Sequence, residues 1–128
     1  MRALLDTHTF LWWLLNADRL SEESRAILTD SANDVYVSAA SAAEIAIKAR
    51  QGRLTLPEPA ESYVPSRLVS EGFLALPVAI SHALRAGVLP LIHGDPFDRL
   101  LVAQAQIEGI PIVTLDPAIS RYDVETIW

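Results

Sequence analysis

The sequence predicts a single α/β domain over residues 1–128, with three α/β/α layers in which helices cover both faces of a central parallel sheet. Short apolar runs rich in β-forming residues alternate along the chain with stretches of helical spacing. The apolar residues of these runs stand at consecutive positions, as in strands buried on both faces. No internal repeat, long linker or charge block divides the 128 residues, so we expect one folding unit.

Four apolar runs are the strand candidates. Each is rich in Val, Ile, Leu, Ala or aromatic residues, and each is bounded by polar, Gly or Pro positions. In chain order they cover residues 2–5, 35–38, 73–76 and 110–114.

Six stretches with helical spacing separate or follow these runs. They cover residues 7–16, 22–31, 42–51, parts of 58–71, 81–86 and 96–108. A glycine follows three of them, at the position where helices commonly end. Ser41 and Glu44 have the spacing of a capping box, which predicts that the third helix begins after Ser41. Pro65 predicts either a kink or a division into two short helices in the fourth stretch.

The composition limits the chemistry that the chain can perform. It has no cysteine, which excludes disulfides, thiolate metal sites and cysteine nucleophiles, so any metal must bind oxygen or histidine. The longest apolar run, residues 10–15, is far shorter than the roughly 20 residues that span a bilayer. We therefore expect a cytoplasmic protein with no membrane association.

The charge balance argues against an ordinary nucleic-acid-binding module. Ten basic residues stand against 16 acidic ones, for a formal net charge of −6, so no general basic surface attracts phosphates. A nuclease remains compatible with this balance, because carboxylates that hold divalent cations raise the acidic count and the bound metal reverses the local field.

Three acidic residues lie where strand candidates end or the next helix begins. Asp6 directly follows the first strand candidate, Asp116 follows the last, and Glu44 follows the second by a few residues. In parallel sheets, ligands collect outside the carboxyl ends of the strands. Taken alone, each residue is also explained as a helix cap or turn residue.

Two further acids open the last helical stretch. Pro96 suits the first helical position, which makes Asp95 the natural N-cap. Asp98 lies three residues later, on the same side and near the positive end of the helix dipole. Its carboxylate is therefore free for another role, such as metal binding.

The placement of these acids predicts a metal site. Asp6, Glu44, Asp98 and Asp116 would converge on one crevice, with Asp95 beside them. Carboxylates in such proximity repel one another strongly unless a cation lies between them. An all-oxygen ligand set points to Mg²⁺, with Mn²⁺ as a substitute.

Four motifs carry a family resemblance, at residues 4–8, 37–48, 93–105 and 113–116. In this order they resemble the motifs of PIN-domain proteins, specifically the VapC-type toxins of type II toxin–antitoxin pairs. The second and third motifs are long and specific, and together the four span the chain. The resemblance implies a PIN-like fold, Mg²⁺-dependent ribonuclease activity, and inhibition by a small VapB-like antitoxin.

The same resemblance assigns the acidic quartet to Asp6, Glu44, Asp98 and Asp116, with Asp95 as an additional acid. For hydrolysis of an RNA phosphodiester, we expect Asp6 and Asp98 to contact the metal directly. Asp116 and Glu44 would bind it directly or through water, and Glu44 or Asp98 would orient the attacking water.

Basic residues near the quartet are candidate phosphate ligands. Lys48 lies one helical turn beyond Glu44 and Arg99 follows Asp98, so both could hold the RNA backbone. The alternatives are an ion pair between Lys48 and Glu44, and a solvated Arg99 side chain. Arg50 and Arg53 are secondary candidates.

Hydroxyl and imidazole groups near the quartet receive weaker assignments. Thr7 and Thr114 adjoin predicted ligands, so they are substrate-site candidates that could bond a metal-bound water, or they are turn and cap residues. His8, His82 and His93 have no metal-ligand spacing, and we expect them to act as caps or to lie at the surface.

Residues 10–15 predict a protein partner. Six successive apolar positions cover more of a helix than one core contact requires. Trp12 and Trp13 point about 100° apart, so we expect at least one ring in a surface groove that receives an antitoxin helix. Burial between the sheet and the next helix is the alternative. We place a homodimer contact elsewhere on the surface.

Two other functions remain open at this point. A PIN-fold protein that binds metal and a partner without turnover would keep the same acids. An aspartyl-phosphate phosphatase would use Asp6 as its nucleophile, but His8 stands where such enzymes carry a second aspartate.

Overall fold

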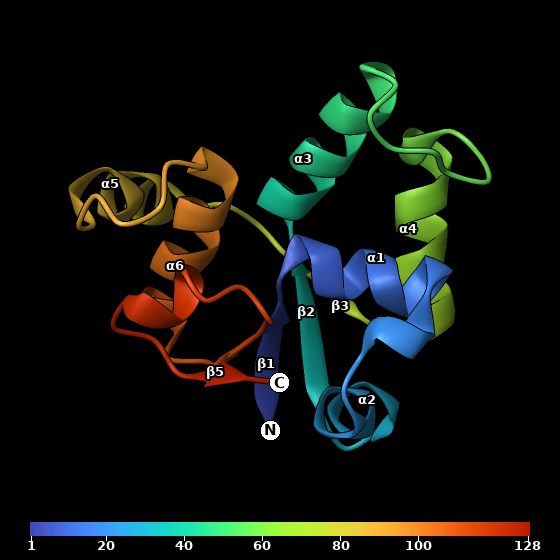
Figure 1. Ribbon diagram of the computed structural model, residues 1–128, viewed down its shortest axis with the longest axis horizontal. Coiled ribbons are helices and arrows are strands. Elements are labelled where there is room, and N and C mark those ends of the chain that lie inside the picture. Colours follow the sequence, from blue (N-terminus) through green and yellow to red (C-terminus); the bar gives the residue numbers. More distant parts are fainter.

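A computed structural model describes all residues 1–128 and has a five-stranded, all-parallel sheet at its centre (Figure 1). The strand order is β3-β2-β1-β4-β5. The strands are β1 (Arg2–Leu5), β2 (Asp34–Ser38), β3 (Leu74–Leu76), β4 (Ile112–Val113) and β5 (Thr126–Ile127). The predicted parallel sheet is confirmed.

Six helices flank this sheet. They are α1 (Thr7–Leu15), α2 (Glu22–Thr29), α3 (Ala39–Arg50), α4 (Ala60–Glu71), α5 (Ile80–Val88) and α6 (Pro96–Glu108). In Figure 1, α5 and α6 lie on one side of the sheet and α1, α2 and α4 on the other, which confirms the α/β/α layers. None of these helices is both long and apolar enough to cross a membrane.

Each face of the sheet has its own core, and alternate residues of β1 enter the two. Leu4 packs with residues of α5 and α6, whereas Ala3 and Leu5 pack with Phe10 of α1 and Val64 of α4. All three β1 residues are fully buried. This explains why the strand is apolar at consecutive positions.

The central position of β1 aligns the strand ends that carry the acids. Leu5 is in register with Val113 of β4, and the backbone N–H of Asp6 donates to the Val113 carbonyl at 3.1 Å. The segments after β1 and β4 therefore leave the sheet side by side.

Helix α3 begins three residues earlier than the capping-box pattern predicts. Its N-cap is Ser38, whose hydroxyl accepts the Ala40 N–H at 2.9 Å, so Ser41 lies inside the helix. The capping box of Ser41 and Glu44 was therefore a wrong prediction. Because Glu44 then falls in the second turn, its carboxylate does not cap α3.

Of the two alternatives predicted at Pro65, the division into two helices is wrong, since α4 continues through this residue as one helix. Proline removes one helical hydrogen bond, at a cost of about 3 kcal/mol in a helix interior. Burial of the neighbouring Tyr63 and Val64 offsets that cost. The two-residue strand β5 was missed, because so short a segment carries no periodicity.

Candidate functional site

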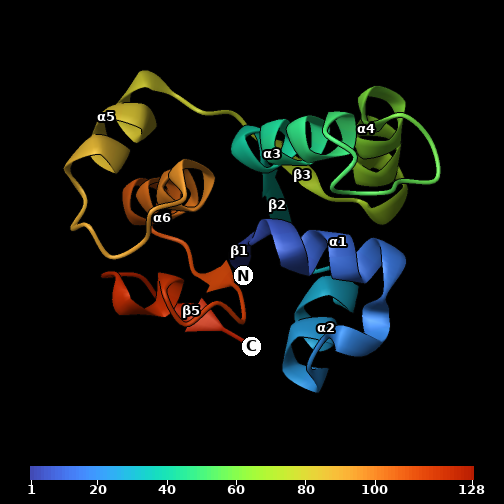
Figure 2. The same ribbon diagram turned by 45° about the horizontal axis from the view of Figure 1, so that its top comes forward.

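The carboxyl end of the sheet gathers the predicted acids from four segments. Asp6 precedes α1, Glu44 lies in α3, Asp98 lies in the first turn of α6, and Asp116 follows β4. Figure 2 brings this end forward and shows α1, α3 and α6 around it. The fold thus brings together residues that are up to 110 positions apart in the chain.

Asp6 and Asp116 are connected by the hydroxyl of Thr114. Thr114 Oγ1 donates to Asp6 Oδ2 at 2.8 Å and accepts the backbone N–H of Asp116 at 3.0 Å. The other oxygen of Asp6, Oδ1, is buried and has no hydrogen-bond partner. Burial raises the pKa of Asp6, and the charges of Asp116 and Glu44 raise it further, against the lowering effects of the Thr114 hydrogen bond and His8.

Glu44 is only 2% exposed and is also left with an unpartnered oxygen. Its Oε2 accepts from Lys48 Nζ at 2.5 Å, one turn along α3, while Oε1 has no partner. A buried oxygen without a donor costs free energy on the order of 1–3 kcal/mol, and more when it is charged. Two such oxygens at one end of the sheet indicate that this end is built to receive a ligand that contacts oxygen.

The pKa of Asp98 is also raised. Burial raises its pKa to about 7, with further contributions from the charges of Asp6, Asp95 and Glu44, while His93 lowers it. Asp95 is the N-cap of α6, as predicted, since its Oδ1 accepts the N–H groups of Phe97 at 2.8 Å and Asp98 at 3.4 Å.

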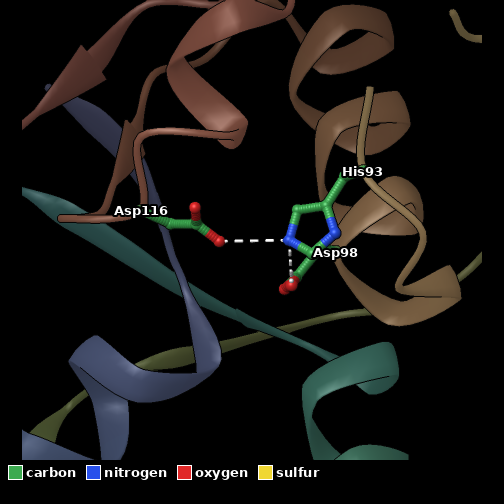
Figure 3. Close-up of side chains that lie close together, drawn as sticks. All are labelled: His93, Asp98 and Asp116. Atoms are coloured by element: carbon green, nitrogen blue, oxygen red, sulfur yellow. Dashed lines mark hydrogen bonds and ion pairs between the residues drawn. The ribbon is translucent and has the colours of Figure 1, made fainter. Parts of the chain in front are cut away.

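His93 lies between Asp98 and Asp116, although no sequence pattern predicted a functional group there. Its Nε2 is 3.0 Å from Asp98 Oδ2 and 3.1 Å from Asp116 Oδ2 (Figure 3). The potential ligand atoms of the three residues lie within 4.8 Å of one another, so Asp98 and Asp116 are close enough to contribute to one metal site. The expectation of a cap or surface role for His93 was therefore incomplete.

The hydrogen bonds of His93 determine which ring nitrogen carries the proton. Nδ1 accepts the backbone N–H of Asp95 at 3.1 Å, so the proton of the neutral ring lies on Nε2. Nε2–H then donates to Asp116 Oδ2, while Asp98 Oδ2 lies 3.0 Å from the same nitrogen without a hydrogen bond from it. In this arrangement the imidazole is a hydrogen-bond donor to Asp116.

Arg99 occupies a different position from the one we expected. Its terminal nitrogens donate to the carbonyls of Ala86, Leu89 and Pro90 at 2.7–3.0 Å. It also donates to the hydroxyl of Tyr122 at 3.2 Å, and the same hydroxyl accepts the His93 backbone N–H at 2.8 Å. Arg99 thus fixes the loop that carries His93, and its guanidinium is committed to this loop instead of facing an RNA phosphate.

Of the remaining candidate site residues, some use their side chains within the fold and others keep an exposed polar group. Thr7 is buried and donates to Ser41 Oγ at 2.8 Å, so its hydroxyl proton is used inside the protein. His82 is a cap, as predicted, because Nδ1 accepts the Ala79 N–H at 2.9 Å. Lys48 has the predicted ion pair with Glu44 but keeps a side chain that is 29% exposed.

Two hollows flank the acids. One is lined by Asp6, His8, Trp12, Leu115, Asp116 and Pro117. The other includes Glu44, Lys48 and Arg53, and His8 lines both. Arg50 is exposed and lines neither hollow.

The two tryptophans of α1 differ in their surroundings. Trp13 is half-buried and its Nε1 donates to Glu71 Oε2 at 2.9 Å. Trp12 contacts Arg19, whose guanidinium carbon lies 4.4 Å from the ring centroid, and the Trp128 ring at 5.8 Å. Only Trp12 borders a hollow, and that hollow is the one that contains Asp6 and Asp116.

The comparison with known families agrees with this arrangement. The family model described as PIN domain matches residues 3–125, nearly the whole chain. The chain belongs to the PIN domain family. This confirms the resemblance on which the acidic quartet was assigned, and it agrees with the observed parallel sheet.

Two relatives of this PIN domain come from Mycobacterium tuberculosis. Ribonuclease VapC22 is 36% identical over 115 residues, which cover 88% of this chain and 85% of that protein. Ribonuclease VapC16 is 48% identical over 69 residues, which cover 54% of this chain. The match with VapC16 spans only 47% of that protein's length.

Solved structures support the fold at low sequence identity. The VapBC2 complex of Rickettsia felis, bound to a promoter DNA fragment, has a chain that matches with a TM-score of 0.72 and 16% identity, covering 99% of this PIN domain and 98% of that chain. FitAcB of Neisseria gonorrhoeae matches with a TM-score of 0.64 and 22% identity, covering 98% and 96%. A toxin–antitoxin complex from Klebsiella pneumoniae has a chain that matches with a TM-score of 0.67 and 15% identity, covering 98% of this PIN domain and 96% of that chain.

Proposed function

We propose that this PIN domain is a metal-dependent endoribonuclease of the VapC type, with Mg²⁺ or Mn²⁺ as its cofactor. The observation that carries the proposal is the pair of buried carboxylate oxygens without partners, Asp6 Oδ1 and Glu44 Oε1, beside the acidic Asp98 and Asp116. The ribonuclease names of the two mycobacterial relatives support the same activity.

The residues fit a hard divalent cation. Asp6, Glu44, Asp98 and Asp116 offer oxygen ligands, and the chain has no cysteine to favour a softer metal. We assign the direct contacts to Asp6 and Asp98, with Asp116 and Glu44 completing the set. Asp95 stays a prediction as a further ligand, and its second oxygen is the one not used in capping α6.

In the proposed reaction, water displaces one ester oxygen from a phosphodiester of RNA. The bound cation would neutralise charge on the phosphoryl oxygens and stabilise the leaving oxygen. Glu44 or Asp98 would accept a hydrogen bond from the attacking water and orient it. Thr114 keeps Asp6 and Asp116 in a fixed relation through its two hydrogen bonds, which makes it a positioning residue.

Lys48 and Arg53 are the proposed contacts to the RNA backbone. They line the same hollow as Glu44, and the Lys48 ammonium has donors left after its bond to Glu44. Positive side chains at this position would counter the net charge of −6 where the phosphates approach.

We further propose a small antitoxin as partner, as in the complexes named for the solved neighbours. A basic segment of that partner would suit the acidic end of the sheet. A homodimer is part of the same proposal. Its supporting feature is a row of exposed side chains four residues apart on α5: Ile80, Leu84 and Val88 are 78%, 70% and 78% exposed.

A PIN-fold protein that binds metal without turnover is the second candidate, since it would use the same unpartnered oxygens. The phosphatase alternative has less support, because Asp6 is 3% exposed, one of its oxygens accepts from Thr114, and the charges of Asp116 and Glu44 lie close enough to raise its pKa.

The deciding experiment is RNA cleavage by the purified chain. We expect single-stranded RNA to be cut with Mg²⁺ or Mn²⁺, to stay intact with EDTA, and to be cut again when excess Mg²⁺ is restored. Cleavage that survives exhaustive chelation would contradict the mechanism. Metal binding without any cleavage of a transcript library would favour the second candidate.

A further inference from the structure

The hollow between α1 and the segment after β4 has the character of a binding site for a flat, neutral group. We define it as the Trp12 hollow, and its volume is about 340 Å³. This lies at the small end of the roughly 300–1,000 Å³ found for ligand pockets. Its lining residues are Asp6, His8, Trp12, Leu115, Asp116 and Pro117.

The Trp12 hollow is continuous with the carboxylate site. Asp6 and Asp116 belong both to its lining and to the proposed metal-binding set. A group that occupies the hollow would therefore be only a few bonds away from a phosphate held at the acids. In RNA, the group at that distance is a nucleobase.

The walls of the hollow favour a base over a phosphate. No lysine or arginine lines it, and its two carboxylates would repel an anion. The indole of Trp12 and the side chains of Leu115 and Pro117 offer apolar surface, and Leu115 is 54% exposed. Carboxylate oxygens at the rim can accept hydrogen bonds from the amino groups of adenine, cytosine or guanine.

The indole is fixed in advance of binding. The Arg19 guanidinium covers it at 4.4 Å, and the rings of Trp128 and His8 lie at 5.8 and 5.9 Å. Contacts on several sides reduce the side-chain entropy that binding would otherwise remove. Aromatic side chains held in this way are common platforms for single-stranded nucleic acid.

We propose that the Trp12 hollow binds the nucleobase next to the scissile phosphate, while the hollow with Lys48 and Arg53 holds the backbone on the other side of the acids. The substrate would then cross the site over His8, which lines both hollows. This inference rests on the proposed ribonuclease function, and it adds base recognition to phosphate chemistry.

Mononucleotide binding tests the inference without requiring cleavage. The indole N–H signal of Trp12, assigned by its loss in Trp12→Phe, is followed by NMR as AMP, CMP or ribose 5-phosphate is added to the intact protein with Mg²⁺. We expect the signal to move with AMP and CMP and to stay in place with ribose 5-phosphate. The two nucleotides should bind roughly tenfold more tightly than the sugar phosphate.

A matched pair of leucine variants separates the hollow from general surface effects. Leu115→Ala should weaken AMP binding severalfold, whereas Leu91→Ala, at a site that is 94% exposed and outside the hollow, should leave it unchanged. Both positions are exposed, so both variants should keep the fold.

The outcomes distinguish this inference from the proposed function. Equal affinity for AMP and ribose 5-phosphate, or AMP binding that is unaffected by Leu115→Ala, would overturn the base site even if RNA is cleaved, and would leave the hollow to a peptide partner. Base-dependent binding in a protein that cleaves no RNA would support the site while the ribonuclease proposal fails.

Discussion

The four carboxylates at the end of the sheet fall into two pairs with different environments. In the inner pair, Asp6 and Glu44 are 3% and 2% exposed, and each keeps one oxygen without a partner. In the outer pair, Asp98 is 8% exposed and Asp116 is half-buried, and one oxygen of each lies near His93 Nε2. Both pairs accept bonds from the protein, but only the inner pair keeps buried oxygens without any donor.

This difference indicates how the protein can fold with four carboxylates close together. The imidazole N–H of His93 bonds Asp116, whereas the inner oxygens Asp6 Oδ1 and Glu44 Oε1 are buried without any donor, which costs free energy. A divalent cation that reaches those oxygens would relieve the cost. The unpartnered inner oxygens should therefore contribute to metal binding together with Asp98, the second direct contact that we assign, and Asp116 should complete the set.

Removing the charge of one proposed metal ligand, from either pair, should have the largest effect on RNA cleavage. Asp6→Asn and Asp98→Asn keep the side-chain shape, and each should reduce RNA cleavage by more than about 100-fold, because a cation can no longer be held in position. Single-turnover cleavage measures the loss. Asp123→Asn changes an exposed aspartate outside the site and is the matched control. Normal rates in either site variant would mean that the quartet is wrongly assigned.

Mg²⁺ should stabilise the folded protein. At about 100 times its Kd, a ligand that binds only the native state contributes about 2.7 kcal/mol, which raises Tm by on the order of 10 °C for a domain of this size. Thermal unfolding with Mg²⁺, compared with Na⁺ at matched ionic strength, measures the gain. Glu44→Gln should lose most of it. An equal gain with Na⁺ would indicate screening in place of a specific site.

The metal-free protein should become less stable as the pH rises from about 4 to about 7. Since the folded-state pKa of Asp98 is raised to about 7 from its ordinary value of 3.8, the native state binds the extra proton in this window. The stabilising contribution is complete below the lower value and is lost as the pH passes the upper one. Denaturant unfolding in EDTA across this range measures the slope.

Asp98→Asn should make this pH profile flatter, because the amide does not titrate. The variant should also be more stable than the wild type above pH 7 in EDTA. A wild-type profile that rises through this window would show that Asp98 is ionised in the metal-free fold.

His93→Ala should have a smaller effect that sharpens the contrast between the two pairs. Without the Nε2–H donor, Asp116 Oδ2 loses its hydrogen bond and Asp98 loses the neighbouring imidazole, so the metal-free Tm should fall by a few degrees. Mg²⁺ should then restore more stability than it adds to the wild type. Leu91→Ala changes a side chain that is 94% exposed in the same loop and outside both hollows, and it serves as control. The same loss with and without Mg²⁺ would refute this role.

Much of the site was predictable because it follows from strand ends. The apolar runs before Asp6 and Asp116, and Pro96 after Asp95, are local signals, and the structure places all three acids as those signals indicate. The start of α3 was less predictable, since Ser38 and Ser41 are both competent caps, and the strand end at Ser38 decides between them.

His93 and Arg99 were not predictable from the chain alone. A single histidine in a loop has no periodicity or ligand spacing, and its position between Asp98 and Asp116 exists only after β4 and α6 are packed. Arg99 follows a site residue in sequence, but the helix turns its side chain toward the carbonyls that end α5. Sequence adjacency therefore gave the wrong partner.

The proposed metal site is tested most directly by locating a divalent cation in a crystal grown with Mn²⁺. Anomalous difference density should appear at the carboxyl end of the sheet, within bonding distance of Asp6 Oδ1, and should vanish in crystals of Asp6→Asn. A fully occupied crystal with Mn²⁺ elsewhere, or with no peak at this oxygen, would contradict the claim that the unpartnered inner oxygens are metal ligands.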